Sequence, residues 1–479
     1  MNFDEPNNLS ESQIDASCRV PLLALFGGAA LWLVVGLALA LVASLTFHKP
    51  DMFADCPWLT YGRAQAAAND LLLYGFCVPA GLGVVLWIFA RLSQAELALP
   101  LVPIAAANIW HLGVLVGVVA ILIGDSTGFT WLEFPRGSSV LLFAAFMLIA
   151  ISAFATFGAR VVRELQPAHW FLLAALFWFP WIYSTANLLL LINHPVRGVT
   201  QAVIDWWFSN NMVFIWLGLV GIGTAFYFLP KLAGRPLKTS YYALFAFWTL
   251  LLFGTWCGIP QDAPVPAWLP AASAVASALL IVPLFMIETV GWWTAWGSVR
   301  SKWDNGSFCF VGSGVDFFFL SGLMVAAMAC PAISRVTEFT WFGPAQSQLQ
   351  ILGFFALTMF GAIYYILPRA AGFDFPFPKL ARVQYWISLL GIAIYVLPLA
   401  IGGVEQGRQL QNPSVPFADI SAAMLPWLRA STTGQLLLLL GGLIFALNIF
   451  GLTLKWKMAL LKKLRAAITA PLDPGEVKP

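Results

Sequence analysis

The sequence predicts an all-α membrane protein that crosses the bilayer about twelve times. Its 479 residues are 60% hydrophobic and only 10% charged, whereas a soluble domain carries about 25% charged residues. The deficit extends along the whole chain, and apolar runs long enough to span a bilayer recur from residue 21 to residue 456. We therefore expect a polytopic membrane protein rather than a soluble domain with one anchor.

The predicted spans follow one another with short loops. A membrane-crossing helix needs roughly 20 mostly apolar residues, and the runs that qualify cover residues 21–46, 66–91, 102–124, 138–160, 169–192, 206–230, 240–261, 267–296, 314–334, 345–368, 383–404 and 431–456. The chain thus divides into an N-terminal tail (1–20), a transmembrane domain (21–456) and a basic C-terminal tail (457–479). No internal repeat is visible, which argues against a transporter built from inverted repeats.

Basic residues indicate the orientation of the spans. Lys and Arg concentrate in the loops after even-numbered spans and in the C-terminal segment "LKWKMALLKKLR". Because an excess of these residues marks the cytoplasmic side, both termini are predicted to be cytoplasmic. The first apolar run follows the acidic segment "NFDEPNNLSESQID", not a basic leader, so we expect it to remain as a helix. The net charge of +3 gives no reason to expect a nucleic-acid partner.

Polar side chains gather at a similar depth on four predicted helices, in the expected outer third of the membrane. They stand in "AAANDLL", "WWFSNN", "GTWCGIPQD" and "GPAQSQLQ". Buried polar groups cost several kcal/mol if they are unpaired, so these should face each other, water or a ligand. Two interpretations remain open, an interhelical network that only fixes packing and a cofactor chamber.

Several long segments resemble a known family. They are "DWWFSNNMVFIWLGLVGIGTAFYFLPKLAGRPLKTSYYALFAFWTLLLFGTWCG", "FGAIYYILPRAAG" and "LPWLRASTTGQLLLLLGGLIFALNIFG". They look like subunit I of heme–copper oxidases, closest to the cbb3-type cytochrome c oxidases, with nitric oxide reductase as a near relative. The resemblance covers most of the chain. It implies a bacterial inner membrane location, membrane lipid as surroundings, and partner subunits such as membrane-anchored cytochrome c subunits.

The chain departs from the family where cofactors bind. The family holds heme b, a high-spin heme and copper through histidines, because neutral imidazole suits iron and copper. The resemblance aligns the six ligand positions with Ala68, Asn210, Pro260, Gln261, Gln346 and Gln348. It aligns an active-site tyrosine with Gly254 and an active-site glutamate with Ala329. Amide oxygens are weak ligands for these metals, so we expect no heme and no bound metal.

The space of the lost cofactors must be filled or collapse, since protein interiors are closely packed. Nearby bulky residues that could fill part of it are Trp206, Trp207, Phe208, Trp256, Phe354 and Phe355. The chain has four histidines, and no two of them are placed to bind one heme between them. We expect His111 to have a hydrogen-bonded structural role and His169 to snorkel at the membrane interface.

Three acidic residues complete the set of candidates. Glu288 lies inside a predicted span and should pair, for example with Lys302 or Arg300, or take up a proton. Asp316 is predicted to cap the start of a helix or to make a loop contact, and Glu133, in "WLEFP", to be solvated in an outer loop.

Three functions follow as hypotheses. The first is a non-catalytic structural or assembly subunit of a respiratory complex, a pseudoenzyme. The second is an active oxidase or nitric oxide reductase subunit with unusual heme ligands. The third is a proton channel or transporter on the emptied scaffold that uses Asp70, Asn210 and Gln346.

Overall fold

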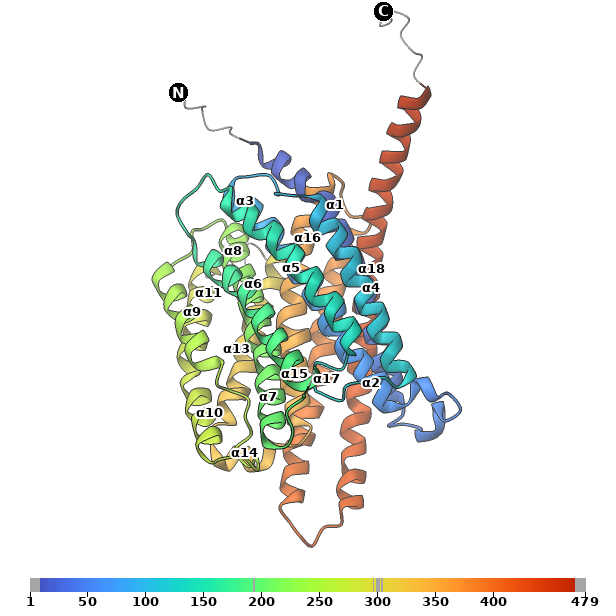
Figure 1. Cartoon of the computed structure of the whole chain (residues 1–479), viewed down its shortest axis with the longest axis vertical. Helices are drawn as coiled ribbons and strands as arrows, with labels where there is room; N and C mark the ends of the chain where they lie inside the picture. The colour runs from blue at the N-terminus through green and yellow to red at the C-terminus, as the bar shows by residue number, and fades with distance from the viewer. Residues whose placement is uncertain (1–8, 193, 296, 299–301, 303–304, 470–479) are drawn as a thin grey trace, which may run out of the picture.

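The computed structural model describes residues 9–469 except 193, 296, 299–301 and 303–304, and the regular elements of this part of the chain are all helices, with no strand (Figure 1). The all-α class predicted from the sequence is confirmed. The elements are α1 (Glu11–Leu45), η1 (Pro50–Phe53), η2 (Pro57–Leu59), α2 (Tyr61–Asp70), η3 (Leu71–Cys77), α3 (Val78–Ser93), α4 (Leu101–Ile123), α5 (Arg136–Gly158), α6 (Pro167–Ala186), η4 (Asn187–Leu191), α7 (Val199–Asn210), η5 (Asn211–Trp216), α8 (Leu217–Ala233), α9 (Ser240–Gly254), α10 (Trp268–Leu279), α11 (Ile281–Ala295), α13 (Gly306–Ala327), α14 (Pro331–Thr337), α15 (Phe342–Gln348), η6 (Leu349–Ala356), α16 (Leu357–Ala371), α17 (Pro378–Leu410) and α18 (Phe417–Thr469).

Eleven helical stretches of the described chain are long and apolar enough to cross a membrane. Each expected span coincides with one of them except 240–261, which forms the 15-residue helix α9. This helix stops at Gly254, and the chain then turns through Gly258, which has a positive φ of 95°. Pro260 follows and cannot continue a helix because its ring blocks the hydrogen bond and clashes with the preceding turn.

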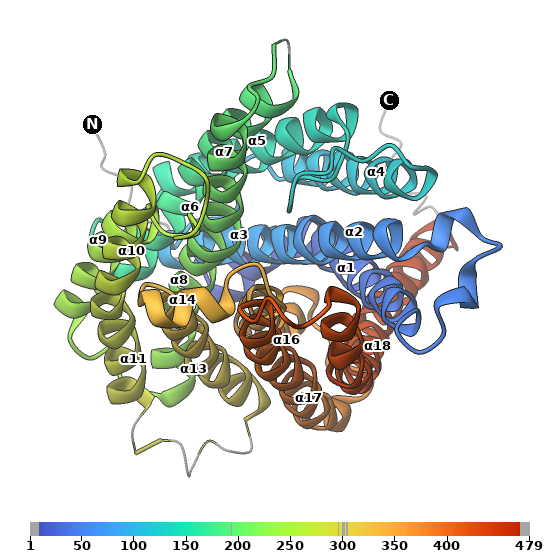
Figure 2. The same cartoon turned by 90° about the horizontal axis from the view of Figure 1, so that it is seen from below.

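Three helical stretches form the centre of the bundle. The apolar windows of Tyr61–Ser93, Val199–Ala233 and Phe342–Ala371 are 100%, 94% and 89% buried, against 44–56% in the other eight. An end-on view shows the remaining helices arranged around this centre (Figure 2). The other spans are half buried because one side of each faces away from the bundle, toward the lipid. The three central stretches are those that carry Ala68, Asn210, Gln346 and Gln348.

The three central stretches share a pattern of structure, so the prediction that the chain has no internal repeat is wrong at this scale. Each contains a π-helical segment: η3, η5 and η6. The π segments begin at residues 71, 211 and 349. An aromatic residue lies sixteen positions after each of these, at 87, 227 and 365. A basic residue lies four positions after the aromatic residue, and the C-cap of the helix, in left-handed backbone conformation, lies seven positions after it. The three sets are Trp87–Arg91–Gln94, Tyr227–Lys231–Gly234 and Tyr365–Arg369–Gly372.

This repeat ties the three stretches together at one end. The ring of Trp87 lies edge-on to those of Tyr227 and Tyr365, with centroids 5.7 and 6.0 Å away. The guanidinium of Arg369 lies 3.5 Å from the centre of the Tyr365 ring, a favourable cation–π contact. The identities differ among the three copies, Trp against Tyr and Gln against Gly, which is why the sequence alone did not reveal them.

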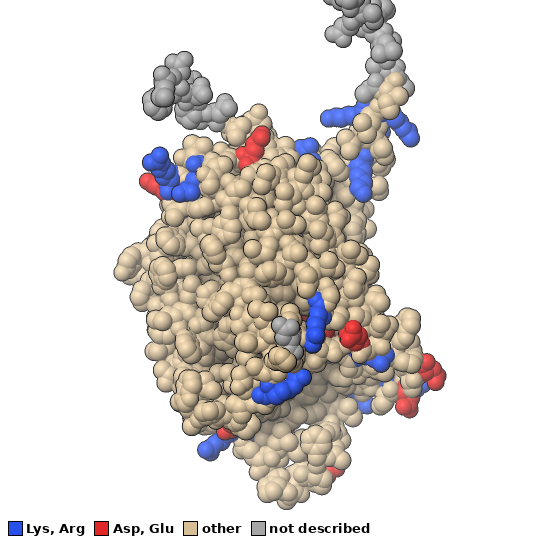
Figure 3. All heavy atoms as spheres, viewed as in Figure 1, with Lys and Arg blue, Asp and Glu red and all other residues tan. Residues whose placement is uncertain are grey.

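The described start of α1 and the end of α18 lie at the same end of the bundle (Figure 1). In the view of Figure 3 the charged side chains lie toward the two ends, and a broad uncharged belt separates them. The 53 residues of α18 make a helix about 80 Å long, which continues past the bundle and carries basic residues. These features describe a multi-pass membrane protein in which the described start of α1 and the end of α18 lie on one side. That this side is the cytoplasm remains a prediction.

Candidate functional site

A cavity of about 550 Å³ is lined by residues of α2, α7, α10 and α15 among others, and these elements lie in the half of the bundle away from the start of α1 (Figure 1). Its walls include five of the six positions that the resemblance aligns with cofactor ligands, namely Asn210, Pro260, Gln261, Gln346 and Gln348. Ala329 also lines it, whereas Ala68 is buried in α2 away from the lining. At least one polar residue from each of the four predicted helices therefore reaches one chamber, namely Asn69, Asn210, Gln261 and Gln346, and this chamber has the size of a ligand pocket.

The polar residues in "SNN" connect the central stretch to its neighbours. The hydroxyl of Ser209 donates to the carbonyl of Thr130 in the α4–α5 loop at 3.1 Å. The amide of Asn210 donates to the carbonyl of Gly254 at 2.8 Å. A Cβ on Gly258 would lie 2.6 Å from the Cβ of Asn210, so the turn after α9 packs directly on this side chain. Two positions aligned with an active site in the family, Asn210 and Gly254, are thus linked by a structural hydrogen bond.

Asn211 makes the largest number of contacts in this group, so we expect Asn211→Ala to destabilise the protein by about 1–3 kcal/mol. Its amide donates to the carbonyls of Trp207 (2.9 Å) and Thr255 (3.2 Å), and its oxygen accepts the indole N–H of Trp178 (3.2 Å). The side chain is fully buried, so truncation leaves several polar groups without partners. Thermal unfolding in detergent micelles measures the loss; Ser209→Ala, whose bond is exposed, is the control and should change little.

The turn that carries Gln261 is held in place by Glu338, the residue directly after α14. The two carboxylate oxygens of Glu338 accept the backbone N–H groups of Gln261 (2.8 Å) and Asp262 (3.2 Å). The side-chain amide of Gln261 donates to the carbonyl of Met328 at 2.7 Å. Gln261 therefore uses its donors to hold the wall of the cavity.

Glutamines of α15 and α18 leave acceptor capacity in the chamber. Gln346 donates to the hydroxyl of Ser321 at 2.9 Å. Gln348 and Gln435 both line the cavity, and the side-chain oxygen of each has no hydrogen-bond partner among the described residues. Buried acceptors in native proteins are nearly always satisfied by protein or water, so we expect ordered water in this cavity.

Asp70 does not belong to the cavity, which corrects the predicted Asp70–Asn210–Gln346 cluster. Its neighbour Asn69 lines the chamber, and Asp70 points instead to the carboxyl of Glu133. Glu133 was expected in solvent but is only 7% exposed. The reason is that its loop folds onto the bundle, where the hydroxyl of Tyr74 donates to the carbonyl of Trp131 at 2.6 Å.

The buried loop carboxyl predicts a pH dependence of stability. Burial raises the pKa of Glu133 from its usual 4.5 to about 7. A carboxyl whose pKa is higher in the folded state stabilises the fold fully below pH 4.5, and this contribution is lost as the pH rises through about 7. We expect Glu133→Gln to raise the melting temperature at pH 8 and to leave it nearly unchanged at pH 4.5, measured in micelles. An equal shift at both pH values would contradict this account.

The histidines do not supply ligands at the cavity. His111 accepts the indole N–H of Trp32 (3.2 Å), and its other ring nitrogen lies 3.2 Å from the carbonyl of Ala24. His169 is buried and accepts the backbone N–H of Gln166 (3.0 Å) at the start of α6, so the prediction that it snorkels is wrong. In the part of the chain that the structure describes, no three His, Cys, Asp or Glu side chains are grouped to hold a metal ion. The amide-rich set of donors in this chamber does not fit heme iron or copper.

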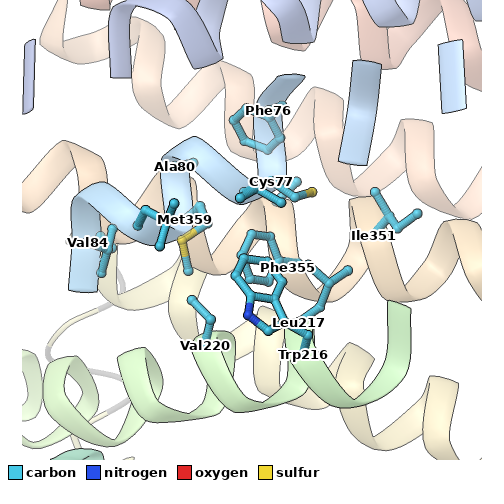
Figure 4. Close-up of a cluster of buried hydrophobic side chains, with 14 of the residues drawn as sticks. Phe76, Cys77, Ala80, Val84, Trp216, Leu217, Val220, Ile351, Phe355 and Met359 are labelled. Atoms are coloured by element: carbon cyan, nitrogen blue, oxygen red, sulfur yellow. The ribbon is translucent and has the colours of Figure 1, made fainter. Parts of the chain in front are cut away.

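Aromatic side chains fill the centre of the bundle next to the cavity. Figure 4 shows Trp216, Phe355 and Met359 lying between the three central stretches, on the side of Cys77. Trp216 is fully buried, and its indole N–H donates to the carbonyl of Ala175 at 3.1 Å. The sequence gave no signal for Trp216, because one tryptophan in an apolar run is ordinary.

The six residues expected to fill the vacated space behave differently from one another. Phe208, Phe354 and Phe355 are fully buried, Trp207 is partly buried, and Trp206 lines the cavity. Trp256 is 57% exposed at the bundle surface, so that expectation is wrong for Trp256. The turn after Gly254 directs its side chain outward.

Glu288 lies on α11, outside the cavity. Its carboxyl accepts the indole N–H of Trp292 and contacts the carboxyl of Asp316. Lys302, the expected partner, is not among these contacts, and Arg300 lies outside the described residues. Asp316 does not cap a helix as predicted, because α13 already begins at Gly306.

Comparison with known proteins agrees with this architecture. The family model described as Cytochrome C and Quinol oxidase polypeptide I matches residues 20–437. The chain is 22% identical over 423 residues to the cbb3-type cytochrome c oxidase subunit CcoN1 of Stutzerimonas stutzeri, covering 86% of this chain and 89% of the relative. It is 24% identical over 477 residues to cytochrome c oxidase subunit 1 of Rhodobacter capsulatus, covering 94% and 88%. A cryo-EM structure of a heme-copper terminal oxidase dimer has the same fold, with a TM-score of 0.73 at 15% identity, over 90% of this chain and 84% of the other.

Proposed function

Because the chain belongs to the heme–copper oxidase subunit I family, we propose that it is a non-catalytic member, a structural or assembly subunit of a respiratory complex in a bacterial inner membrane. Its role would be to present the family's helical scaffold to partner subunits such as membrane-anchored cytochromes c. Electron transfer would be carried out by other chains of the complex.

One observation carries the proposal. Five positions aligned with metal ligands line a single cavity, and among them Asn210, Gln261 and Gln346 use their side chains in hydrogen bonds to neighbouring helices and turns. Amide nitrogens are donors without a free lone pair, and amide oxygens bind heme iron and copper weakly. The same side chains suit a scaffold, because each joins two helices.

The transport hypothesis has one observation in its favour, the pair of unpartnered acceptors at Gln348 and Gln435. Their oxygens favour a hydrated chamber. Asp70, the acid assigned to that hypothesis, lies outside the lining. A proton-flux assay in proteoliposomes with Asp70→Asn and Glu288→Gln tests this alternative: flux that both substitutions abolish would favour it over a scaffold.

A reduced-minus-oxidised visible spectrum of the purified chain tests the proposed function. A non-catalytic subunit shows no Soret or α-band change beyond trace contamination. A redox difference spectrum that co-purifies with the chain at constant ratio to protein would favour the active oxidase with unusual ligands instead.

A further inference from the structure

Asp316 places a carboxyl group on the outer face of the bundle at mid-membrane depth. It is the eleventh of the 22 residues of α13, which puts it about 15 Å from the start of that helix. Its side chain is exposed at the surface of the chain. Ionisable residues in membrane spans nearly always face the bundle interior or a partner, because lipid offers them neither hydrogen bonds nor solvation. An exposed acid at this depth therefore needs an explanation.

A second carboxyl lies beside it. Glu288, on the adjacent helix α11, contacts the carboxyl of Asp316 directly. One Glu288 oxygen accepts the indole N–H of Trp292, and the other is buried without a hydrogen-bond partner among the described residues. Two neighbouring carboxylates repel each other, and an ionised carboxyl within a membrane span needs a cationic partner.

No described Lys or Arg contributes to the electrostatics of this pair. Apart from burial, the influences on the two carboxyls come from Trp292 and from each other. The nearby hydroxyl of Ser313 is already hydrogen-bonded to that of Tyr385 at 2.8 Å. An ionised carboxyl of this pair would have no basic partner among the described residues, and a charge costs about 2.5–3.5 kcal/mol at the centre of a span.

The surface next to the pair has room for another helix. Gly312 lies one turn before Asp316, so both face the same side of α13. A Cβ at Gly312 would meet nothing within 4 Å, which means that no part of the described chain covers this position. Figure 2 shows α11 and α13 next to each other at the edge of the bundle. Small residues at such a position let helix backbones approach closely in membranes.

We propose that the α11–α13 face docks a transmembrane helix of a partner subunit that carries one Lys or Arg at mid-membrane depth, paired with the Glu288–Asp316 carboxyls. One basic side chain at this depth would form an ion pair with the exposed carboxyl of Asp316, and Gly312 provides the space for its helix. This inference specifies the kind of helix that a partner subunit would contribute to the complex, and it therefore rests on the proposed function as a scaffold.

Synthetic membrane-spanning Leu/Ala peptides with one central residue serve as the probe. The full-length chain and a peptide are reconstituted in phosphatidylcholine vesicles, and binding is measured by energy transfer between labels on the two. The central-Arg peptide should bind at least about fivefold more tightly than the central-Leu peptide. This difference corresponds to one interhelical polar contact worth about 1 kcal/mol. The central-Glu peptide should bind more weakly than the central-Leu peptide.

Variants locate the contact. Glu288→Gln/Asp316→Asn should remove the preference for the central-Arg peptide, and Asp316→Asn alone, at an exposed position that does not threaten folding, should reduce it. Asp419→Asn, which removes an acid from the outer start of α18, should leave the preference intact. Equal binding of the Arg and Leu peptides, or a preference that survives the double substitution, would overturn the inference.

This experiment is independent of cofactor content. If the purified chain shows stoichiometric heme, the proposed function fails, yet the peptide preference can still be measured. If the chain lacks heme and shows no preference, the scaffold role stands and the docking inference alone fails.

Discussion

Trp216→Ala is expected to lower the free energy of unfolding by about 3–5 kcal/mol, the cost of deleting a buried aromatic side chain and leaving a cavity. Trp216 is fully buried, and its ring packs against those of Phe179 (5.7 Å) and Phe355 (6.4 Å). It also donates a hydrogen bond to the carbonyl of Ala175 on α6. If side chains hold the three central stretches together, this substitution should be among the most damaging in the chain.

Trp256→Ala is the matched control, because Trp256 is 57% exposed. Its loss should cost less than about 0.5 kcal/mol, as is usual for surface substitutions. Both variants can be compared by thermal and denaturant unfolding in the same detergent. Similar stability of the two variants would mean that the central aromatic cluster does not carry the packing assigned to it.

Gly403→Ala is expected to cost about 1–3 kcal/mol or more, because it overfills a backbone-to-backbone contact. A Cβ at Gly403 on α17 would lie 2.3 Å from the backbone nitrogen of Phe342, the first residue of α15. Backbone cannot yield as a flexible side chain does, so α15 must move. Since α15 carries Gln346 and Gln348, the wall of the cavity should move with it.

Gly343→Ala is the control for this substitution. It adds the same methyl group one residue from Phe342, where a Cβ would meet nothing within 4 Å. Alanine is a better helix former than glycine, but Pro344 follows and disfavours helical backbone at a residue that carries a Cβ, so this variant should change the stability by less than about 1 kcal/mol in either direction. Limited proteolysis and melting temperature measure both effects. If Gly403→Ala were as stable as Gly343→Ala, the close packing of α15 on α17 would be refuted.

Hydropathy predicted the helical class and the positions of nearly all spans, because a lipid-facing helix needs a long apolar run whatever its neighbours are. It predicted the depth of the polar residues for the same reason. The direction of each side chain around its helix could not be predicted this way. Asn69 lines the cavity whereas Asp70 faces Glu133, although they are consecutive. Successive residues on a helix lie about 100° apart, and only packing decides which one faces the chamber.

Loops and surface exposure were the other sources of error. Nothing in the sequence shows that the loop carrying Glu133 folds onto the bundle, since its hydrogen bond to Tyr74 joins residues far apart in the chain. The exposed position of Asp316 was also missed, because an acid near a predicted span boundary resembles a helix cap. Both depend on where a helix begins or where a loop rests, which local patterns specify poorly.

We propose that this chain holds its core together with its own side chains and binds no heme or copper. Pyridine hemochrome analysis and metal determination on the purified full-length chain test it most directly. The account predicts neither heme nor copper in stoichiometric amount. Heme or copper recovered in a fixed molar ratio to the polypeptide would contradict it.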